Sequence, residues 1–278
     1  MTTSASTQSV STKGTALITG ASSGIGAVYA DRLAHRGYDL VLVARRGDKL
    51  RALADELSRT TGRRIEPVEA DLDDEAGLAR VEDLLRRRAD IRVLVNNAGV
   101  AATTPLLESE FAGVQGILSL NVNALTRLTY AAVPRLVAQG GGTLINIASI
   151  VGVAPEMLNG VYGASKAYVI ALTQSLQHEL GDKGLRVQAV LPGATATALW
   201  DVAGGVDKLP PQIVMTAEDM VDAALAGLDL GEIITIPSLP DVADWTAYED
   251  ARRKLAPNLS HAKPAARYAT ARNATATA

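Results

Sequence analysis

Short runs of apolar and β-branched residues alternate with longer helix-forming stretches along most of this chain. A run that is apolar throughout indicates a strand buried on both faces, and a helix between successive strands indicates parallel pairing. Because such crossovers are right-handed, the pattern predicts a doubly wound α/β fold, a seven-stranded parallel sheet with helices on both faces. The strands are predicted at residues 15–19, 40–44, 65–70, 91–95, 143–148, 186–190 and 232–236.

Helices are predicted between these strands. The longest helical stretch, 108–138, is expected to be interrupted near Pro134, because proline removes a backbone donor and clashes with the preceding turn. After the last strand, a helix over 241–255 would place Trp245 and Tyr248 on one face. The other helices are predicted at residues 25–36, 50–58, 76–88, 162–180 and 217–228.

The 278 residues suit one large domain of this architecture. We expect a disordered Ser/Thr tail over 1–12, a single domain over 13–256 and a frayed tail over 257–278. No apolar run approaches the ~20 residues of a membrane span, and the start lacks the features of a secretion signal. A cytoplasmic protein is therefore expected by default.

Charge and composition exclude several kinds of site. The net charge is -3, from 27 basic and 30 acidic residues, so no single-sign field indicates binding to nucleic acid or to a membrane. The chain has no cysteine, which excludes disulfides and thiolate chemistry. Its three histidines lie far apart in the sequence, and no metal site is expected.

The first predicted strand runs into a glycine-rich turn, Thr19-Gly20-Ala21-Ser22-Ser23-Gly24-Ile25-Gly26, and a helix follows at once. Glycines let the backbone approach a pyrophosphate closely, and a helix N-terminus offers it free N–H groups. A glycine-rich turn alone is weak evidence, but its place between strand and helix predicts a dinucleotide-binding Rossmann fold. The alternative is a turn that binds no ligand. The binding candidates are Gly20, Ser22, Ser23, Gly24, Ile25 and Gly26.

The end of the second strand bears on the choice between NAD and NADP. A carboxylate there would hold the ribose 2′-hydroxyl of NAD, whereas an arginine pairs with the 2′-phosphate of NADP. The chain has Arg45 and Arg46 at this point, and Asp39 lies at the opposite end of the strand. NADP(H) is therefore favoured over NAD(H). The alternative is that both arginines are solvated loop residues.

Tyr162, Lys166 and Ser149 form a candidate catalytic group. A spacing of four residues puts Tyr162 and Lys166 on one helix face. The Lys166 ammonium and an oxidised nicotinamide ring would favour the phenolate, and lowering the tyrosine pKa by ~3 units needs ~4 kcal/mol. Ser149 follows the fifth strand, where its hydroxyl would stabilise charge on a substrate oxygen. The alternative for Tyr162 and Lys166 is an ordinary amphipathic helix. The alternative for Ser149 is a loop serine near a strand end.

The glycine spacing, the Tyr162-x-x-x-Lys166 pair and Ser149 thirteen residues before Tyr162 resemble the short-chain dehydrogenase/reductase family, in its compact single-domain branch. The resemblance covers residues 13–237. It implies an NADP(H)-dependent oxidoreductase in which Tyr162 and Ser149 handle the substrate oxygen during hydride transfer. It also implies a fourth catalytic residue, which shapes a helix break and holds a water. The match prefers Asn121 over the nearby Asn123, and a paired structural role is the alternative.

The same resemblance extends the cofactor site along the strand ends. Asp71 would bind the adenine amino group, and the alternative is that it caps a helix. Asn97 would lie close to the adenosine ribose, and the alternative is that it only forms a turn. Lys166 would also hydrogen-bond the nicotinamide ribose, and the segment around Thr195 and Thr197 would bind the carboxamide. The remaining cofactor candidates are Arg45, Arg46, Leu72, Ala98, Gly99, Tyr162, Pro192 and Gly193.

A substrate cover is expected over 194–216. The apolar residues of this cover and of the loop after Ser149 favour an apolar ketone or aldehyde, or a 3-oxoacyl compound. The substrate candidates are Ser149, Val151, Met157, Tyr162, Leu199 and Trp200. Relatives pair through the helices that precede residue 138 and begin at Tyr162, so a homodimer or homotetramer is expected. A non-catalytic dinucleotide sensor and a sugar-nucleotide epimerase or dehydratase are the competing functions.

Overall fold

The computed structural model describes residues 11–203 and 205–268. The predicted tail over 1–12 therefore lies almost wholly outside the described residues, as do Gly204 in the predicted cover and the end of the predicted tail over 257–278. The chain divides into two compact units, one ending at Ser238 and the other beginning at Leu239. The predicted domain limit at residue 256 stays a prediction.

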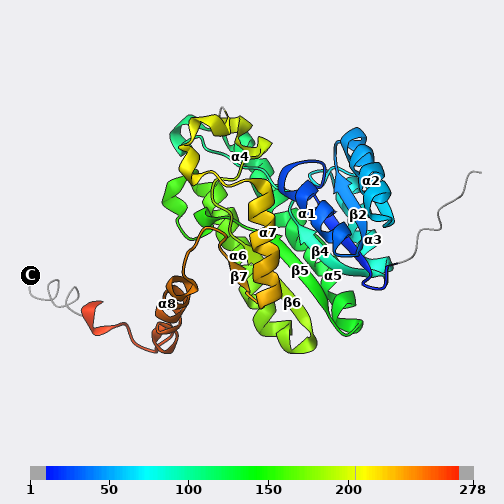
Figure 1. The fold of residues 1–278 in the computed structure, drawn as a ribbon. Helices are drawn as coiled ribbons and strands as arrows, with labels where there is room; N and C mark the ends of the chain where they lie inside the picture. Colours follow the sequence, from blue (N-terminus) through cyan, green and yellow to red (C-terminus); the bar gives the residue numbers. More distant parts are fainter. Residues whose placement is uncertain (1–10, 204, 269–278) are drawn as a thin grey trace, which may run out of the picture. The chain divides into compact units, whose positions relative to one another are not determined.

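The first unit is built on a seven-stranded, wholly parallel sheet in the order β3-β2-β1-β4-β5-β6-β7, as predicted (Figure 1). Strand order reverses between β1 and β4, which makes the sheet a doubly wound Rossmann-type α/β fold. The central strands are buried along almost their whole length because helices cover both faces. The strands are β1 (Thr15–Thr19), β2 (Asp39–Ala44), β3 (Ile65–Glu69), β4 (Ile91–Asn96), β5 (Gly142–Ile147), β6 (Leu185–Val190) and β7 (Ile234–Thr235).

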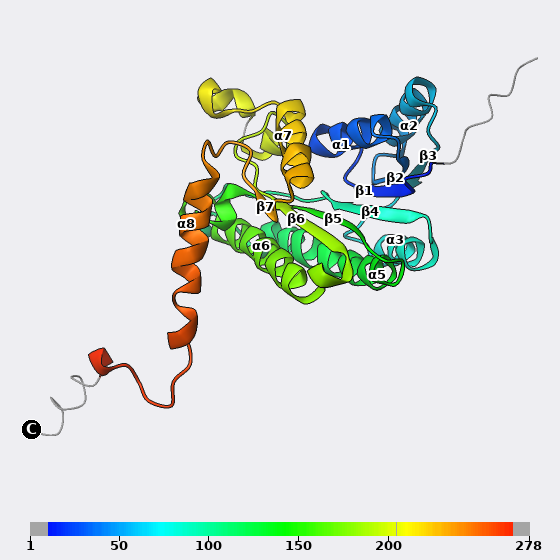
Figure 2. The same ribbon diagram turned by 60° about the horizontal axis from the view of Figure 1, so that its bottom comes forward.

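Three helices pack on each face of the sheet, and each layer closes its own apolar core (Figure 2). One layer holds Tyr29 and Leu33 of α1 together with residues of α2 and α7. The other holds Leu78 and Leu128 with residues of α3, α5 and α6. The first layer is α1 (Gly24–His35), α2 (Gly47–Thr61) and α7 (Ala217–Leu230); the second is α3 (Glu75–Arg87), α5 (Leu125–Ala138) and α6 (Gly160–Leu180).

The two edge strands differ from the prediction. β3 is partly exposed rather than buried, and it carries Pro67, a residue that edge strands tolerate because one side of them makes no ladder bonds. β7 covers only residues 234–235 of the predicted 232–236. The continuous apolar runs therefore identify the central strands better than the edges.

The break in the long helical stretch was predicted at the wrong residue. The helix α5 continues through Pro134, and the irregularity is a π-helical segment, Leu118–Ala124, between α4 (Phe111–Ile117) and α5. Pro134 and Tyr130, four residues earlier, are both exposed, so water can satisfy the carbonyl that the proline leaves unpaired. The π-helical segment contains Asn121, the residue that the family resemblance associates with a helix break.

The second unit contains the helix α8 (Val242–Arg253), which confirms the helix predicted over 241–255. The rings of Trp245 and Tyr248 stack with their centres 5.1 Å apart, as expected of residues on one helix face. Within residues 11–203 and 205–268, no helix is long and apolar enough to cross a membrane.

Candidate active site

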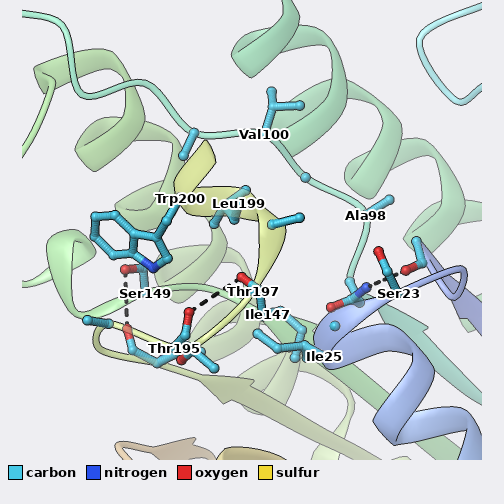
Figure 3. A pocket seen from close by; sticks show the side chains of 18 of the residues that line it. Ser23, Ile25, Ala98, Val100, Ile147, Ser149, Thr195, Thr197, Leu199 and Trp200 are labelled. Carbon is cyan, nitrogen blue, oxygen red and sulfur yellow. Dashed lines mark hydrogen bonds between the residues drawn. The ribbon is translucent and has the colours of Figure 1, made fainter. Parts of the chain in front are cut away.

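A cavity of about 1350 Å³ opens at the carboxyl ends of the strands of the first unit. It is larger than the ~300–1,000 Å³ of an ordinary small-molecule site, so it has room for a cofactor and a substrate together. In Figure 3, Ser23, Ile25 and Ala98 lie at one end of the cavity, and Ser149, Leu199 and Trp200 lie at the other. The cavity wall includes every predicted site residue except Gly26 and Asn121.

The glycine-rich turn forms one end of this cavity. Gly20 and Gly24 have φ of +67° and +54°, values that favour glycine. A Cβ on Gly26 would lie 2.4 Å from the Gly20 carbonyl oxygen, so this glycine allows the helix to pack on the turn rather than facing the cavity. No side chain caps α1 at Ser23, which leaves its first N–H groups to meet an anion.

Two arginines and a carboxylate lie next to the turn. Arg46 donates hydrogen bonds to the hydroxyls of Ser22 and Ser23, the latter at 2.6 Å. Arg45 lies 3.8 Å from the Asp71 carboxylate and is largely exposed. This arrangement places positive charge beside the glycine-rich turn.

Contacts bear on the alternatives that were left open for two polar residues. Asp71 does not cap α3; that role belongs to Asp74, which accepts a hydrogen bond from the Gly77 N–H. Asn97 turns its side chain inward and donates to the Thr19 carbonyl oxygen at 2.8 Å, so it supports the glycine-rich turn.

Tyr162, Lys166 and Ser149 lie close together in the wall of the cavity. Lys166 is buried and donates to the Ile147 carbonyl oxygen at 2.9 Å, with its Nζ 5.7 Å from the centre of the Tyr162 ring. The Ser149 hydroxyl lies 3.3 Å from the Pro192 carbonyl oxygen. Strand β5 ends two residues before Ser149, and α6 carries the other two groups, so their approach depends on how α6 packs on β5.

Burial dominates the ionisation of this group. It raises the pKa of the Tyr162 phenol, and a hydrogen bond with Ser149 offsets only part of the rise. Burial thus outweighs the other influences on the pKa of Tyr162, and the lowering that Lys166 and a bound oxidised nicotinamide ring would produce together stays a prediction. Burial also lowers the pKa of Lys166 to about 8, so its ammonium still predominates at neutral pH.

Asn121 lies behind the site and not in its wall. Its amide donates to the Val100 carbonyl oxygen at 2.8 Å and to the Ser165 hydroxyl at 3.2 Å, and its oxygen accepts from the Val100 N–H at 2.9 Å. These bonds hold the chain after β4 against α6. These bonds show the paired structural role that was the alternative, and the catalytic role that the resemblance implies stays a prediction.

The cover begins where β6 ends. Thr195 is buried and pairs with Met215, and two backbone hydrogen bonds of 2.8 and 2.9 Å tie the two ends of the segment together. Thr197 follows within the clasped loop and also lines the cavity. The clasp fixes where the cover starts and ends.

The substrate half of the cavity has two apolar walls. Val151 and Met157 lie on one, and Leu199 and Trp200 on the cover. No sequence motif marks several further lining residues, which lie after β4 and β7, in the cover and in the first turn of α7. Those after the strands follow the rule that ligands bind at strand ends. The further lining residues include Val100, Ala101, Thr103, Gln212, Ile213, Asp219 and Ser238.

Comparison with known proteins agrees with this architecture. The family described as short chain dehydrogenase matches residues 14–204. A short-chain dehydrogenase from Sphingobium yanoikuyae, solved in complex with NADPH, is 48% identical with a TM-score of 0.88 over 91% of this chain and 98% of that one. A bulky-bulky ketone specific alcohol dehydrogenase from Comamonas testosteroni is 42% identical, with a TM-score of 0.85 over 92% and 98%. Sulfoacetaldehyde reductase 2 from Chromohalobacter salexigens is 33% identical over 84% of this chain and 96% of its own. The chain therefore belongs to the short-chain dehydrogenase/reductase family of oxidoreductases.

Proposed function

We propose that this protein is an NADP(H)-dependent oxidoreductase that interconverts a bulky, uncharged ketone and its alcohol. The observation that carries the proposal is the convergence of Tyr162, Lys166 and Ser149 in a cavity with a glycine-rich cradle at one end and apolar walls at the other.

The raised pKa of Tyr162 suits a proton donor. When bound, the reduced cofactor supplies the hydride for the carbonyl carbon. The Tyr162 hydroxyl donates its proton to the carbonyl oxygen, and the Ser149 hydroxyl leaves its long bond to the Pro192 carbonyl to donate to the same oxygen. The Lys166 ammonium stabilises the phenolate that forms. Oxidation of the alcohol follows the reverse course.

The charge of the walls supports an uncharged substrate. Among the side chains that the structure describes, the basic ones lining the cavity are Arg45, Arg46 and Lys166. The first two follow β2 at the cofactor end, and Lys166 is used by the catalytic group. A sulfonate such as that of sulfoacetaldehyde therefore lacks a partner here, whereas the bulky ketones named for the Comamonas testosteroni enzyme match the apolar walls.

A carbonyl panel tests the proposal directly. The purified protein is assayed with bulky aromatic ketones, small aldehydes and sulfoacetaldehyde, each with NADPH and with NADH. We expect turnover of the bulky ketones with NADPH, and its loss in Tyr162→Phe with cofactor affinity nearly unchanged. Cofactor binding without turnover of any compound would instead favour the dinucleotide sensor. Activity on nucleotide sugars would favour the epimerase or dehydratase.

The preference for NADP rests on Arg45 and Arg46. Replacing Arg46 by Ala removes the guanidinium that lies against Ser22 and Ser23, and replacing Arg45 by Asp repels a 2′-phosphate. Each change is expected to weaken NADPH binding ~10-fold or more and NADH binding little. Arg59→Ala, at the far end of α2, is the control. Equal losses for both cofactors, measured by titration, would contradict the assignment.

We also propose a homodimer or homotetramer. Leu118, Tyr130 and Tyr168 are large apolar side chains left exposed on the stretch before residue 138 and on α6, the elements expected to pair. Light scattering at micromolar concentration should give a multiple of the 29.0 kDa chain, and a monomer would contradict this proposal.

A further inference from the structure

Four buried polar side chains form a hydrogen-bonded ladder between the sheet and two helices of the first unit. They are Thr129 of α5, Asn96 of β4, Asn146 of β5 and Thr173 of α6, and none is more than 3% exposed. The Asn96 amide nitrogen donates to the Thr129 hydroxyl at 3.1 Å and to the Asn146 amide oxygen at 3.0 Å. The Asn146 amide nitrogen donates to the Thr173 hydroxyl at 2.9 Å.

The asparagine amides are the donors of the ladder: Asn96 donates to both of its neighbours, and Asn146 donates to Thr173. The Thr129 hydroxyl donates to the carbonyl oxygen of Leu125, and the Thr173 hydroxyl donates to that of Val169, each at 2.8 Å. Since each hydroxyl has one hydrogen, both threonines must accept from an asparagine amide. Reversing either amide alone would place two donors or two acceptors face to face, so these bonds agree with one orientation of each amide.

The Asn146–Thr173 half of the ladder joins the two elements that carry the proposed catalytic group. Thr173 lies seven residues after Lys166 and eleven after Tyr162, on the same face of α6. Asn146 precedes Ile147, whose carbonyl accepts the Lys166 ammonium, and lies three residues before Ser149. The bond therefore fixes the position of α6 along β5, and with it the approach of Tyr162 and Lys166 to Ser149.

We propose that Asn146 and Thr173 are positioning residues for the reaction, acting through the placement of α6 on β5. This inference rests on the proposed function, because it assigns no role of its own in the chemistry. The side chains touch neither cofactor nor substrate, since neither lines the cavity.

The chain supplies a matched control for this proposal. Thr129 is equally buried, donates to a carbonyl four residues earlier and accepts from an asparagine amide, as Thr173 does. Its helix, α5, carries none of Ser149, Tyr162 and Lys166. Asn121, which precedes α5, is held by bonds of its own to Val100 and Ser165.

The test compares Thr173→Val with Thr129→Val. Each leaves one asparagine N–H unpaired in the core, so urea unfolding should show similar losses of stability. Thr173→Val should lower kcat at least ~10-fold, because small displacements of catalytic groups are costly, while KM for NADPH changes less than about twofold. The acidic limb of the pH profile for alcohol oxidation should move to higher pH, since a displaced ammonium stabilises the phenolate less.

Two further variants complete the design. Thr173→Ser restores the hydroxyl and should restore kcat and the pH profile. If Thr173→Val does not fold, Thr173→Ala replaces it, because the smaller side chain leaves room for water beside the Asn146 amide. The same decrease in kcat and the same shift of the pH profile are expected. Equal kcat in Thr173→Val and Thr129→Val, or no recovery in Thr173→Ser, would overturn the positioning role. An active Tyr162→Phe would overturn the proposed function instead.

Discussion

Lys166 shows how a buried residue in the wall of a cavity can lower the stability of its own fold. Its side chain is buried, and the burial lowers its pKa to about 8 from an ordinary value of 10.5. At a pH between about 8 and 10.5, the unfolded chain therefore still holds the Lys166 proton that the folded chain has already released. It follows that folding is penalised at neutral pH, and that the penalty is relieved as the pH rises from 8 towards 10.5.

Replacing Lys166 by Met should consequently stabilise the cofactor-free protein. The pKa difference corresponds to ~3 kcal/mol, from which the lost hydrogen bond to Ile147 subtracts ~1 kcal/mol. We expect a gain of about 1–2 kcal/mol at pH 7 that shrinks by pH 10, together with loss of activity. Urea unfolding of both proteins at the two pH values measures it. An equal gain at pH 7 and pH 10 would contradict the assignment of the penalty to a buried charge.

At the scale of the element, α6 is anchored at three levels along its length. Asn159 caps its start, accepting from the Val161 and Tyr162 N–H groups at 2.9 and 3.4 Å and donating to the Thr104 carbonyl oxygen at 2.6 Å. Ser165 bonds to Asn121 in the middle, and Thr173 bonds to Asn146 further on. The first of these anchors holds the turn that carries Tyr162.

Asn159→Ala should therefore affect both folding and catalysis. Loss of the cap should cost ~1 kcal/mol of stability, and loss of the Thr104 contact frees the loop that lines the cavity beside Tyr162. We expect a kcat reduced ~10-fold or more. Asp74→Ala removes a comparable cap from α3, which carries no catalytic candidate, and should lower the melting temperature with kcat unchanged. Equal kcat values for the two variants would show that the Asn159 cap has no bearing on catalysis.

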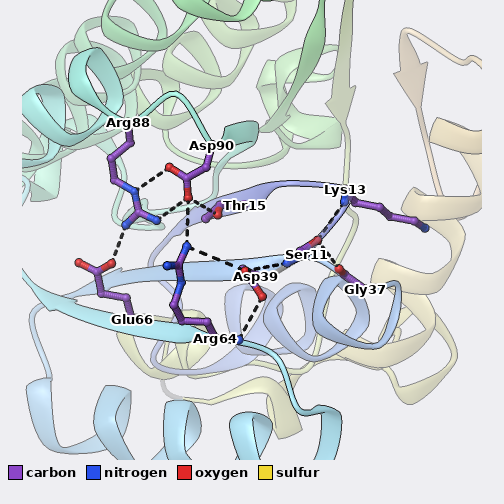
Figure 4. Close-up of polar contacts among 9 residues, drawn as sticks. All are labelled: Ser11, Lys13, Thr15, Gly37, Asp39, Arg64, Glu66, Arg88 and Asp90. Atoms are coloured by element: carbon purple, nitrogen blue, oxygen red, sulfur yellow. Dashed lines mark hydrogen bonds and ion pairs between the residues drawn. The ribbon is translucent and has the colours of Figure 1, made fainter. Parts of the chain in front are cut away.

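At the scale of the whole first unit, the two ends of the sheet have different tasks. The cavity lies at the carboxyl ends of the strands, whereas a network of charged groups lies at the amino ends (Figure 4). There Asp39 is buried and accepts the N–H groups of Ser11 and Arg64 at 3.2 and 3.1 Å. Asp90 accepts from Thr15 and Arg88, and these bonds hold its pKa well below the usual range of a carboxyl.

Substitution in this network should change stability alone. Asp39→Ala leaves two backbone N–H groups without their acceptor and should cost ~2–4 kcal/mol. The length of β2 puts the site ~17 Å away, so the cofactor Kd and kcat should be unchanged below the unfolding transition. Thermal unfolding and a fluorescence titration of NADPH provide the two measurements. A changed Kd for NADPH in the fully folded variant would show that the charged network affects the cavity as well as stability.

Much of this molecule could be predicted from the sequence because its central strands are apolar runs and its site residues follow them. The glycine-rich turn, Tyr162, Lys166 and Ser149 share one cavity as expected. The misplaced helix break shows the limit: Pro134 is tolerated on an exposed face, and the π-helical segment goes with contacts between Asn121 and Val100. Such contacts between distant segments, like those of Arg46 with Ser22, leave no periodic signal in a sequence.

The clasp between Thr195 and Met215 lets the length and sequence of the cover vary while its two ends stay in place. Since two backbone hydrogen bonds close its base, the closure entropy of the loop changes only slowly with the number of residues inserted or deleted beyond it. Natural variation can then exchange cavity-lining residues such as Leu199 and Trp200 without disturbing the strand ends and the glycine-rich turn on the other side of the cavity.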